Sequence, residues 1–237
     1  SAASATDPHL LAHNQAHNQS RTETKELITT QTGGLQMTHF EKFLTESKFE
    51  TLNEPCLEIA KNQAARFVDD IAMWLGGKAK PRWLSIVGRS GTGKTHLAKE
   101  IYRYVWRNLG GETSSDKLFY LDFKFATADA LAEQWRSRKS AYLPEYERAP
   151  LLVVDDIGTV ADKSGFVTDA MYTLLSRRMG KWTVITSNLT YAAISSQFDE
   201  RLADRMLRDG NVVASIDCQS WARRSLAKNK EAKDVCR

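Results

Sequence analysis

The chain has 237 residues, of which 42% are hydrophobic and 26% are charged, with a formal net charge of +4 at pH 7. This composition excludes a wholly disordered or collagen-like chain, and the length fits one domain of ordinary size with appendages. No run approaches the roughly 18 apolar residues of a membrane-spanning helix, and residues 1–30 lack a signal-peptide pattern, so we expect a cytoplasmic protein with no membrane partner.

The N-terminal part differs in composition from the rest of the chain. Residues 1–36 are rich in Ser, Ala, Thr, Asn, Gln and His and contain few large apolar side chains. Such a segment buries too little surface to offset the entropy of its own ordering, so we expect a polar flexible arm. A short amphipathic run then predicts a helical docking segment over residues 37–56. Residues 57–237 form the predicted main domain, which ends in a basic tail.

From residue 56 onward, helical patterns alternate with short apolar runs. An amphipathic helix is predicted from Cys56 to Trp74, and Gly76 ends it. Five apolar runs predict strands at Trp83–Val87, Leu118–Phe123, Leu151–Val154, Thr183–Thr186 and Val212–Ile216. This alternation indicates an α/β fold in which a five-stranded parallel sheet is flanked by helices on both faces.

The segment that follows the first predicted strand reads GRSGTGKT over residues 88–95, a full match to the phosphate-binding loop GxxxxGK[ST]. Its glycines let backbone N–H groups and a helix N-terminus face an anion. We expect Lys94 to reach the β and γ phosphates of ATP and the Thr95 hydroxyl to bind Mg²⁺. The predicted nucleotide-binding residues are Gly88, Arg89, Ser90, Gly91, Thr92, Gly93, Lys94, Thr95 and His96.

Polar side chains also follow the third and fourth predicted strands. Asp155 and Asp156 end the third, and Asn188 ends the fourth. Ligands bind at the carboxyl ends of the strands in open α/β sheets. We expect Asp155 to bind Mg²⁺ directly or through its water, and Asp156 to polarise the attacking water. Asn188 is expected to contact the γ-phosphate or to position that water.

A charged helical segment lies over residues 198–206. Arg201 and Arg205 are four residues apart and share one face, as do Glu200 and Asp204. On the residues alone, this spacing is typical of a salt-bridged helix that faces solvent.

Four segments in this order resemble the AAA+ ATPases of the DnaC-type helicase loaders and IstB-type transposition helpers: GKTHLA (93–98), LLVVDDIG (151–158), ITSN (185–188) and ERLADRM (200–206). The resemblance covers about residues 37–225. It implies an AAA+ P-loop ATPase that is stimulated by its oligomer or DNA and forms a homo-oligomer. We expect slow hydrolysis, because Asp156 is one methylene shorter than the Glu commonly found at its position. In this group Arg205 matches the arginine finger that completes a neighbouring subunit's active site, with Arg201 in reserve.

The C-terminal part departs from the pattern of that group. There, a second nucleotide-sensing arginine usually follows a Ser-aromatic pair, whereas here Ser220 and Trp221 are followed by Ala222, Arg223 and Arg224. The arginine is displaced by one position, which leaves open which of the two senses nucleotide. About 20 residues follow the fifth predicted strand, too few for a full helical lid domain.

Together these features predict an ATP-dependent protein that binds DNA, single strands favoured, and loads a replicative helicase. The alternative is a transposition helper that assembles on duplex DNA and recruits a transposase. A third reading, a P-loop switch or kinase, would not need the pair Asn188 and Arg205. The polar arm favours the loader because it resembles a partner-docking extension. DNA contacts are predicted for Lys124, Arg136, Arg138, Lys139, Arg223 and Arg224.

Overall fold

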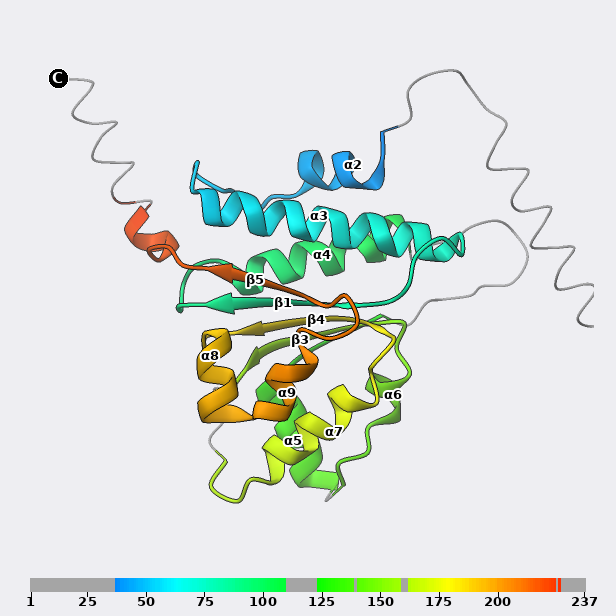
Figure 1. Ribbon diagram of the computed structural model, residues 1–237, viewed down its shortest axis with the longest axis vertical. Coiled ribbons are helices and arrows are strands. Elements are labelled where there is room, and N and C mark those ends of the chain that lie inside the picture. Colours follow the sequence, from blue (N-terminus) through cyan, green and yellow to red (C-terminus); the bar gives the residue numbers. More distant parts are fainter. Residues whose placement is uncertain (1–36, 110–122, 139, 159–161, 225, 227–237) are drawn as a thin grey trace, which may run out of the picture. The chain divides into compact units, whose positions relative to one another are not determined.

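The computed structural model describes residues 37–109, 123–138, 140–158, 162–224 and 226, and Figure 1 shows the arrangement of their elements. The strands are β1 (Trp83–Gly88), β2 (Lys124–Thr127), β3 (Leu151–Ile157), β4 (Trp182–Ser187) and β5 (Val212–Ile216). The helices are α2 (His39–Glu46), α3 (Pro55–Leu75), α4 (Lys94–Asn108), α5 (Ala128–Arg138), α6 (Pro144–Glu147), α7 (Phe166–Ser176), α8 (Tyr191–Ala193), the π-helical turn η1 (Ile194–Phe198) and α9 (Glu200–Arg205).

The five strands form one parallel sheet in the order β2-β3-β4-β1-β5. Strand β1 pairs with β4 on one side, where Trp83 faces Thr183, and with β5 on the other, where Leu84 faces Val212. Every residue of β1 and β4 is buried. This confirms the predicted five-stranded parallel sheet and places β1, after which the glycine-rich loop begins, between β4 and the edge strand β5.

Helices cover both faces of the sheet (Figure 1). Helices α2, α3 and α4 lie over one face, and α5 to α9 lie over the other. Successive residues of a strand point to opposite faces, so Leu84 packs with the first group while Trp83 packs with the second. The sheet is therefore the middle layer between two hydrophobic cores, as the continuous apolar runs predicted.

The second strand lies later in the chain than predicted. The prediction covered Leu118–Phe123, but β2 is Lys124–Thr127, Phe123 has no strand structure, and residues 118–122 lie outside the described residues. Strand β2 is at the edge of the sheet, where only one side pairs with a neighbour. Such a strand tolerates charged and small residues, so the more apolar run before it carried the stronger pattern.

The segment predicted to dock a partner contains α2. Thr38 caps this helix and exchanges hydrogen bonds with Glu41, forming a capping box. Phe43 is fully buried, with its ring centroid 5.4 Å from that of Tyr104 on α4, and Phe49 is buried just after the helix. Helix α2 thus shares the core of α3 and α4, while the predicted arm, residues 1–36, lies outside the described residues. None of the described helices is long and apolar enough to span a membrane.

Candidate functional site

The loop between β1 and α4 has the backbone that a phosphate-binding loop requires. Gly88 has a φ of 141° and Gly93 a φ of 103°, both in a region that favours glycine. A Cβ atom at Gly88 would lie 2.2 Å from the carbonyl oxygen of Ile216 on β5, so no side chain fits there. Gly93 caps α4, whose first-turn N–H groups border the loop and are available to an anion.

Lys94, the first residue of α4, has only 5% of its surface exposed. Its Nζ donates hydrogen bonds to the carbonyl oxygen of Arg89 at 2.7 Å and to Oδ1 of Asn188 at 2.8 Å. Burial lowers the pKa of Lys94, and the nearby Asp156 and Asp155 oppose that shift. Both hydrogen-bond acceptors are neutral, so the ammonium is fixed in place without being neutralised by a direct ion pair.

Asp155 is buried at the end of β3 and accepts two hydroxyl hydrogen bonds through Oδ1. The Oγ1 of Thr95 lies at 2.9 Å and the Oγ1 of Thr186 at 2.6 Å. Among the described residues, no group of three or more His, Cys, Asp or Glu could hold a metal ion. Mg²⁺ usually takes one or two protein oxygens and completes its shell with phosphate and water, so Thr95 and Asp155 fit this ion together with a nucleotide.

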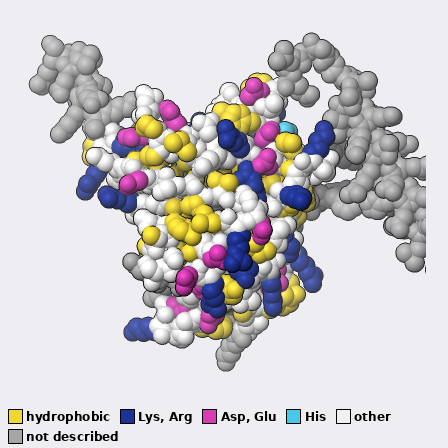
Figure 2. Space-filling model, viewed as in Figure 1, with side chains coloured by type: hydrophobic (Ala, Val, Ile, Leu, Met, Phe, Trp, Pro, Cys, Tyr) yellow, Lys and Arg dark blue, Asp and Glu magenta, His cyan; other side chains and the backbone are white. Residues whose placement is uncertain are grey.

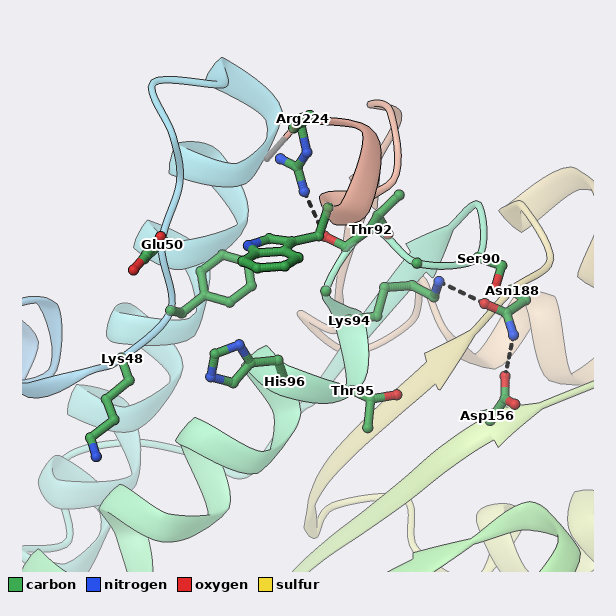
Figure 3. Close-up of a pocket in the computed structure, with 14 residues that line it drawn as sticks. Lys48, Glu50, Ser90, Thr92, Lys94, Thr95, His96, Asp156, Asn188 and Arg224 are labelled. Carbon is green, nitrogen blue, oxygen red and sulfur yellow. Dashed lines mark hydrogen bonds between the residues drawn. The ribbon is translucent and has the colours of Figure 1, made fainter. Parts of the chain in front are cut away.

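Asp156 is oriented by an irregularity in β3. The register with β4 shifts between Val154 and Ile157, and Asp156 itself has a φ of 65°. Such bulges re-aim side chains and are frequent beside active sites. Oδ1 of Asp156 accepts a hydrogen bond from Nδ2 of Asn188 at 2.6 Å. Lys94, Asn188 and Asp156 therefore form a continuous hydrogen-bonded row across the ends of α4, β4 and β3 (Figure 3).

A cavity of about 520 Å³ opens beside this row, within the size range of small-molecule sites. The residues that line it are Lys48, Phe49, Glu50, Ser90, Gly91, Thr92, Gly93, Lys94, Thr95, His96, Asp156, Asn188, Trp221 and Arg224. Of the predicted nucleotide-binding residues, Gly88 and Arg89 are outside this lining, and the side chain of Arg89 is 80% exposed and 3.7 Å from Asp217. Residues 48–50, which lie between α2 and α3, and Trp221 also line the cavity. The sequence did not predict this, because no local motif marks them.

The helical turn at residues 221–224 distinguishes the two C-terminal arginines. The backbone N–H of Trp221 donates to the carbonyl oxygen of Gly91 at 2.7 Å, which ties the turn to the glycine-rich loop. Arg224 is 8% exposed and lines the cavity, with Nη2 at 3.4 Å from the carbonyl oxygen of Thr92, whereas Arg223 is exposed. Nε and Nη1 of Arg224 are buried without a hydrogen-bond partner. This burial does not fit the prediction that Arg224 contacts DNA.

Ion pairs around α9 differ from those expected within one helix. Arg201 pairs with Asp199 at 2.8 Å and with Asp169 of α7 at 3.2 Å. Asp204 pairs with Arg208, beyond the end of the helix. Neither Glu200 nor Asp204 forms an ion pair with Arg201, whose two carboxylate partners lie outside α9.

Arg205 is bound differently from Arg201. Its Nη2 donates to the hydroxyl of Tyr172 on α7 at 2.7 Å, and it forms no ion pair with a described residue. Its carbonyl oxygen accepts from Nδ2 of Asn211 at 2.7 Å, while Oδ1 of Asn211 accepts from the backbone N–H of Trp83, also at 2.7 Å. Trp83 is the first residue of β1. The backbone of Arg205 is therefore anchored at the amino end of this strand, whereas the glycine-rich loop follows its carboxyl end.

The remaining predicted DNA contacts among the described residues are on the edge strand β2 and on α5. Lys124 begins β2, and Arg136 and Arg138 are exposed in the last turn of α5, where Arg138 also pairs with Glu145 at 2.9 Å. Lys139 lies outside the described residues. On the face drawn in Figure 2, basic side chains are interspersed with acidic ones and do not gather into one large patch.

Comparison with known proteins identifies the fold and the family. The bacterial DnaA ATPase domain matches residues 40–213. No curated protein sequence is significantly similar to the chain. Domain III of the Thermotoga maritima replication initiation protein DnaA has 23% sequence identity and a TM-score of 0.54 over 76% of this chain and 72% of that chain.

Two further solved structures have the same fold. The DnaC helicase loader has 18% identity and a TM-score of 0.51, over 67% of this chain and 90% of that one. A replication initiator DnaA bound to AMPPCP and single-stranded DNA has 16% identity and a TM-score of 0.52, over 82% of this chain and 55% of that one. The chain thus spans about half the length of that initiator. The AAA+ fold of the helicase-loader type, inferred from the four sequence segments, is confirmed.

Proposed function

The chain belongs to the family of the bacterial DnaA ATPase domain, and on this basis we propose that it is an ATP-dependent AAA+ protein of DNA replication that binds single-stranded DNA and loads a replicative helicase. The family and the AAA+ fold support ATP binding and a role in replication initiation or helicase loading.

The hydrogen-bonded row of Lys94, Asn188 and Asp156 carries the ATPase proposal. Lys94 binds the β and γ phosphates, because its ammonium is fixed at the mouth of the loop by neutral acceptors. Asp156 accepts a proton from the attacking water, and Asn188 holds that water between the phosphate and the carboxylate. Thr95 and Asp155 would hold Mg²⁺, which shields phosphate charge when it is bound.

The nucleotide-binding part is tested by Lys94→Ala. We expect ATP affinity to fall roughly 10- to 100-fold, because a charge-assisted hydrogen bond contributes about 1.5–3 kcal/mol. Isothermal titration with Mg-ATP measures the loss. Lys99→Ala is the matched control, since Lys99 is exposed on the same helix and outside the cavity lining. Equal affinities of the two variants would contradict the assignment of the loop.

Arg205 is the proposed arginine finger, acting on the nucleotide of a neighbouring subunit. Its backbone is tied through Asn211 to Trp83, while the glycine-rich loop follows the other end of β1. The six residues of β1 span about 16 Å, farther than an arginine side chain reaches, which supports a role in trans and not in cis. Arg201 is the weaker candidate, because two carboxylates already offset its charge.

Mixed assemblies test the finger. Arg205→Ala chains should bind ATP but hydrolyse it at least ~10³-fold more slowly, in line with the loss of an arginine finger. Adding Lys94→Ala chains, which retain the finger, should restore part of the rate, because a mixed interface joins an intact pocket to an intact Arg205. If the mixture co-assembles by size-exclusion chromatography and stays inactive, Arg205 has no role in trans.

The partner is proposed from the fold that the chain shares with a helicase loader and with an initiator bound to single-stranded DNA. A pull-down with the full chain as bait, with and without ATP, should retain a hexameric replicative helicase. The Lys94→Ala chain serves as the control for ATP dependence. Retention of a transposase in place of a helicase would overturn the loader proposal in favour of a transposition helper.

A further inference from the structure

Helices α7 and α9 face each other through two matched pairs of side chains. On α7, Asp169 and Tyr172 are three residues apart, and on α9, Arg201 and Arg205 are four apart, so each pair occupies one helix face. Asp169 pairs with Arg201, and Tyr172 bonds to Arg205. The register of the two helices therefore gives each arginine its own partner on α7.

Tyr172 contacts both arginines with its ring but only one with its hydroxyl. The guanidinium carbon of Arg201 lies 4.1 Å from the ring centroid, and that of Arg205 lies at 4.9 Å. The hydroxyl accepts a hydrogen bond from Nη2 of Arg205 at 2.7 Å. This hydrogen bond is the main cause of a lowered pKa of the Tyr172 phenol. The aromatic face and the hydroxyl together restrict the rotamers of Arg205.

The two arginines differ in how their charge is compensated. Asp199 holds Arg201 through two hydrogen bonds, at 2.8 Å and 3.2 Å, and Asp169 adds an ion pair. Arg205 is half-buried and is held by a neutral phenol, and no described carboxylate forms an ion pair with it. A neutral acceptor fixes a guanidinium while leaving its charge available to an incoming phosphate, whereas a carboxylate would compete with that phosphate.

We propose that Tyr172 is the positioning residue of the arginine finger, holding Arg205 in the orientation in which it meets the nucleotide of the neighbouring subunit. The inference rests on the proposed trans role of Arg205. Nothing in the sequence around Tyr172 points to this role, because it arises from the packing of α7 against α9. In this role Tyr172 acts through Arg205, and it is not among the residues that line the cavity.

The test confines the substitution to the subunit that supplies the finger. Arg205→Ala chains provide the intact pockets, and they are mixed either with Lys94→Ala chains or with chains carrying both Lys94→Ala and Tyr172→Phe. In either mixture, only the Lys94-substituted chain supplies a finger. We expect kcat with the doubly substituted donor to be about 10- to 100-fold lower, because a small misplacement of a catalytic group lowers the rate by up to about 10²-fold, with KM for ATP unchanged. Tyr172→Leu, which also removes the ring, should lower kcat further.

Tyr142→Phe in the Lys94→Ala donor is the matched control. Tyr142 also packs its ring against an arginine, with the guanidinium carbon of Arg177 at 5.4 Å, and we expect no change in kcat. If the donor with both Lys94→Ala and Tyr172→Phe restores the same rate as the Lys94→Ala donor, the role of Tyr172 is overturned while the trans role of Arg205 stands. A Tyr172→Phe donor with a lowered Tm or impaired co-assembly would also overturn it, since the residue would then be structural. If the Lys94→Ala donor itself restores no activity, the trans finger fails and the inference fails with it.

Discussion

Asp155 and Asp156 are neighbours in the chain, yet their surroundings suit them to different tasks. Asp155 is 5% exposed and receives hydroxyl hydrogen bonds from Thr95 and Thr186, which fix it within the sheet. Asp156 lies within the register shift of β3, lines the cavity and accepts a hydrogen bond from Asn188. A fixed buried carboxylate suits a metal ligand, while a carboxylate at the cavity surface can exchange a proton with water.

Substitution of each carboxylate by its amide should separate these tasks. Asp156→Asn keeps the shape but cannot accept a proton, so we expect Mg-ATP binding to persist and kcat to fall by about 10²- to 10⁴-fold. Asp155→Asn should instead raise the Mg²⁺ concentration needed for half-maximal hydrolysis. Magnesium titrations of kcat for the two variants and the parent measure both effects. Unchanged hydrolysis by Asp156→Asn would remove it from the mechanism.

The residues of the site divide into those with a local sequence signal and those without one. The loop at residues 88–95, the carboxylates after β3 and Asn188 could be predicted, because a strand end followed by polar or glycine residues is a local pattern. Phe49, Trp221 and Tyr172 could not, because folding brings each of them to the site or the finger from a distant segment. The sequence likewise could not show that Arg224 and not Arg223 lines the cavity, because this depends on which side chain of a short helical turn faces the glycine-rich loop.

Among the elements, strands β1, β3, β4 and β5 were predicted better than the edge strand β2. Strands β1, β3 and β4 lie between two neighbouring strands, and β5, although it is also at an edge, has an apolar run of its own, so all four coincide with predicted runs. Strand β2 has a single neighbour and the short sequence KFAT, so hydrophobicity alone placed it too early. The bulge in β3 had no counterpart in the apolar pattern, although it is what re-aims Asp156.

Helix α2 is attached to the rest of the fold by polar contacts as well as by Phe43. Nδ1 of His39 lies 3.1 Å from the Tyr104 hydroxyl, and the N–H of Phe40 donates to Oδ1 of Asp69 at 3.2 Å. Burial is the main cause of a lowered pKa of His39, and Lys42 adds to it, while Asp69 and Glu46 oppose it. The folded protein therefore binds a proton at His39 less readily than the unfolded chain does.

The sign of this shift predicts that α2 loosens in mild acid. Attachment of α2 is complete above the ordinary histidine value of about 6.5 and weakens as the pH falls toward the lower pKa of the folded state. Hydrogen exchange of the α2 amides, corrected for the intrinsic pH dependence, should show more opening at pH 5.5 than at pH 7.5. His39→Gln keeps a polar group beside Tyr104 but does not titrate, so its opening should be independent of pH over this range. The same acid response in both proteins would assign the effect to another group.

On the scale of the whole molecule, the cavity and Arg205, the proposed finger, are tied to opposite ends of the strands. The cavity lies at the carboxyl ends of β1, β3 and β4, and Arg205 is tied to the amino end of β1. Two different patches that complete one site make a head-to-tail contact, which closes into a ring or continues as a helical filament. The proposed ATPase is thus expected to be active only as an assembly, with each interface contributing one site.

An assembly of this kind presents the basic residues of α5 repeatedly along its surface, which leads to a prediction for DNA binding. The logarithm of the association constant for single-stranded DNA should fall linearly with the logarithm of the salt concentration between roughly 50 and 200 mM, and each lost phosphate contact should reduce the magnitude of the slope by about 0.7. Replacing Arg136 and Arg138 together by Ala should therefore lower the slope by up to about 1.4. Fluorescence anisotropy with a labelled oligonucleotide in the presence of ATP measures it. The control variant replaces Arg66 on α3 and Lys78, three residues after α3, by Ala. Both side chains are exposed, and this double substitution removes the same charge. If both double variants change the slope equally, net charge and not a DNA contact at α5 accounts for the effect, and a slope near zero for the parent would exclude phosphate contacts altogether.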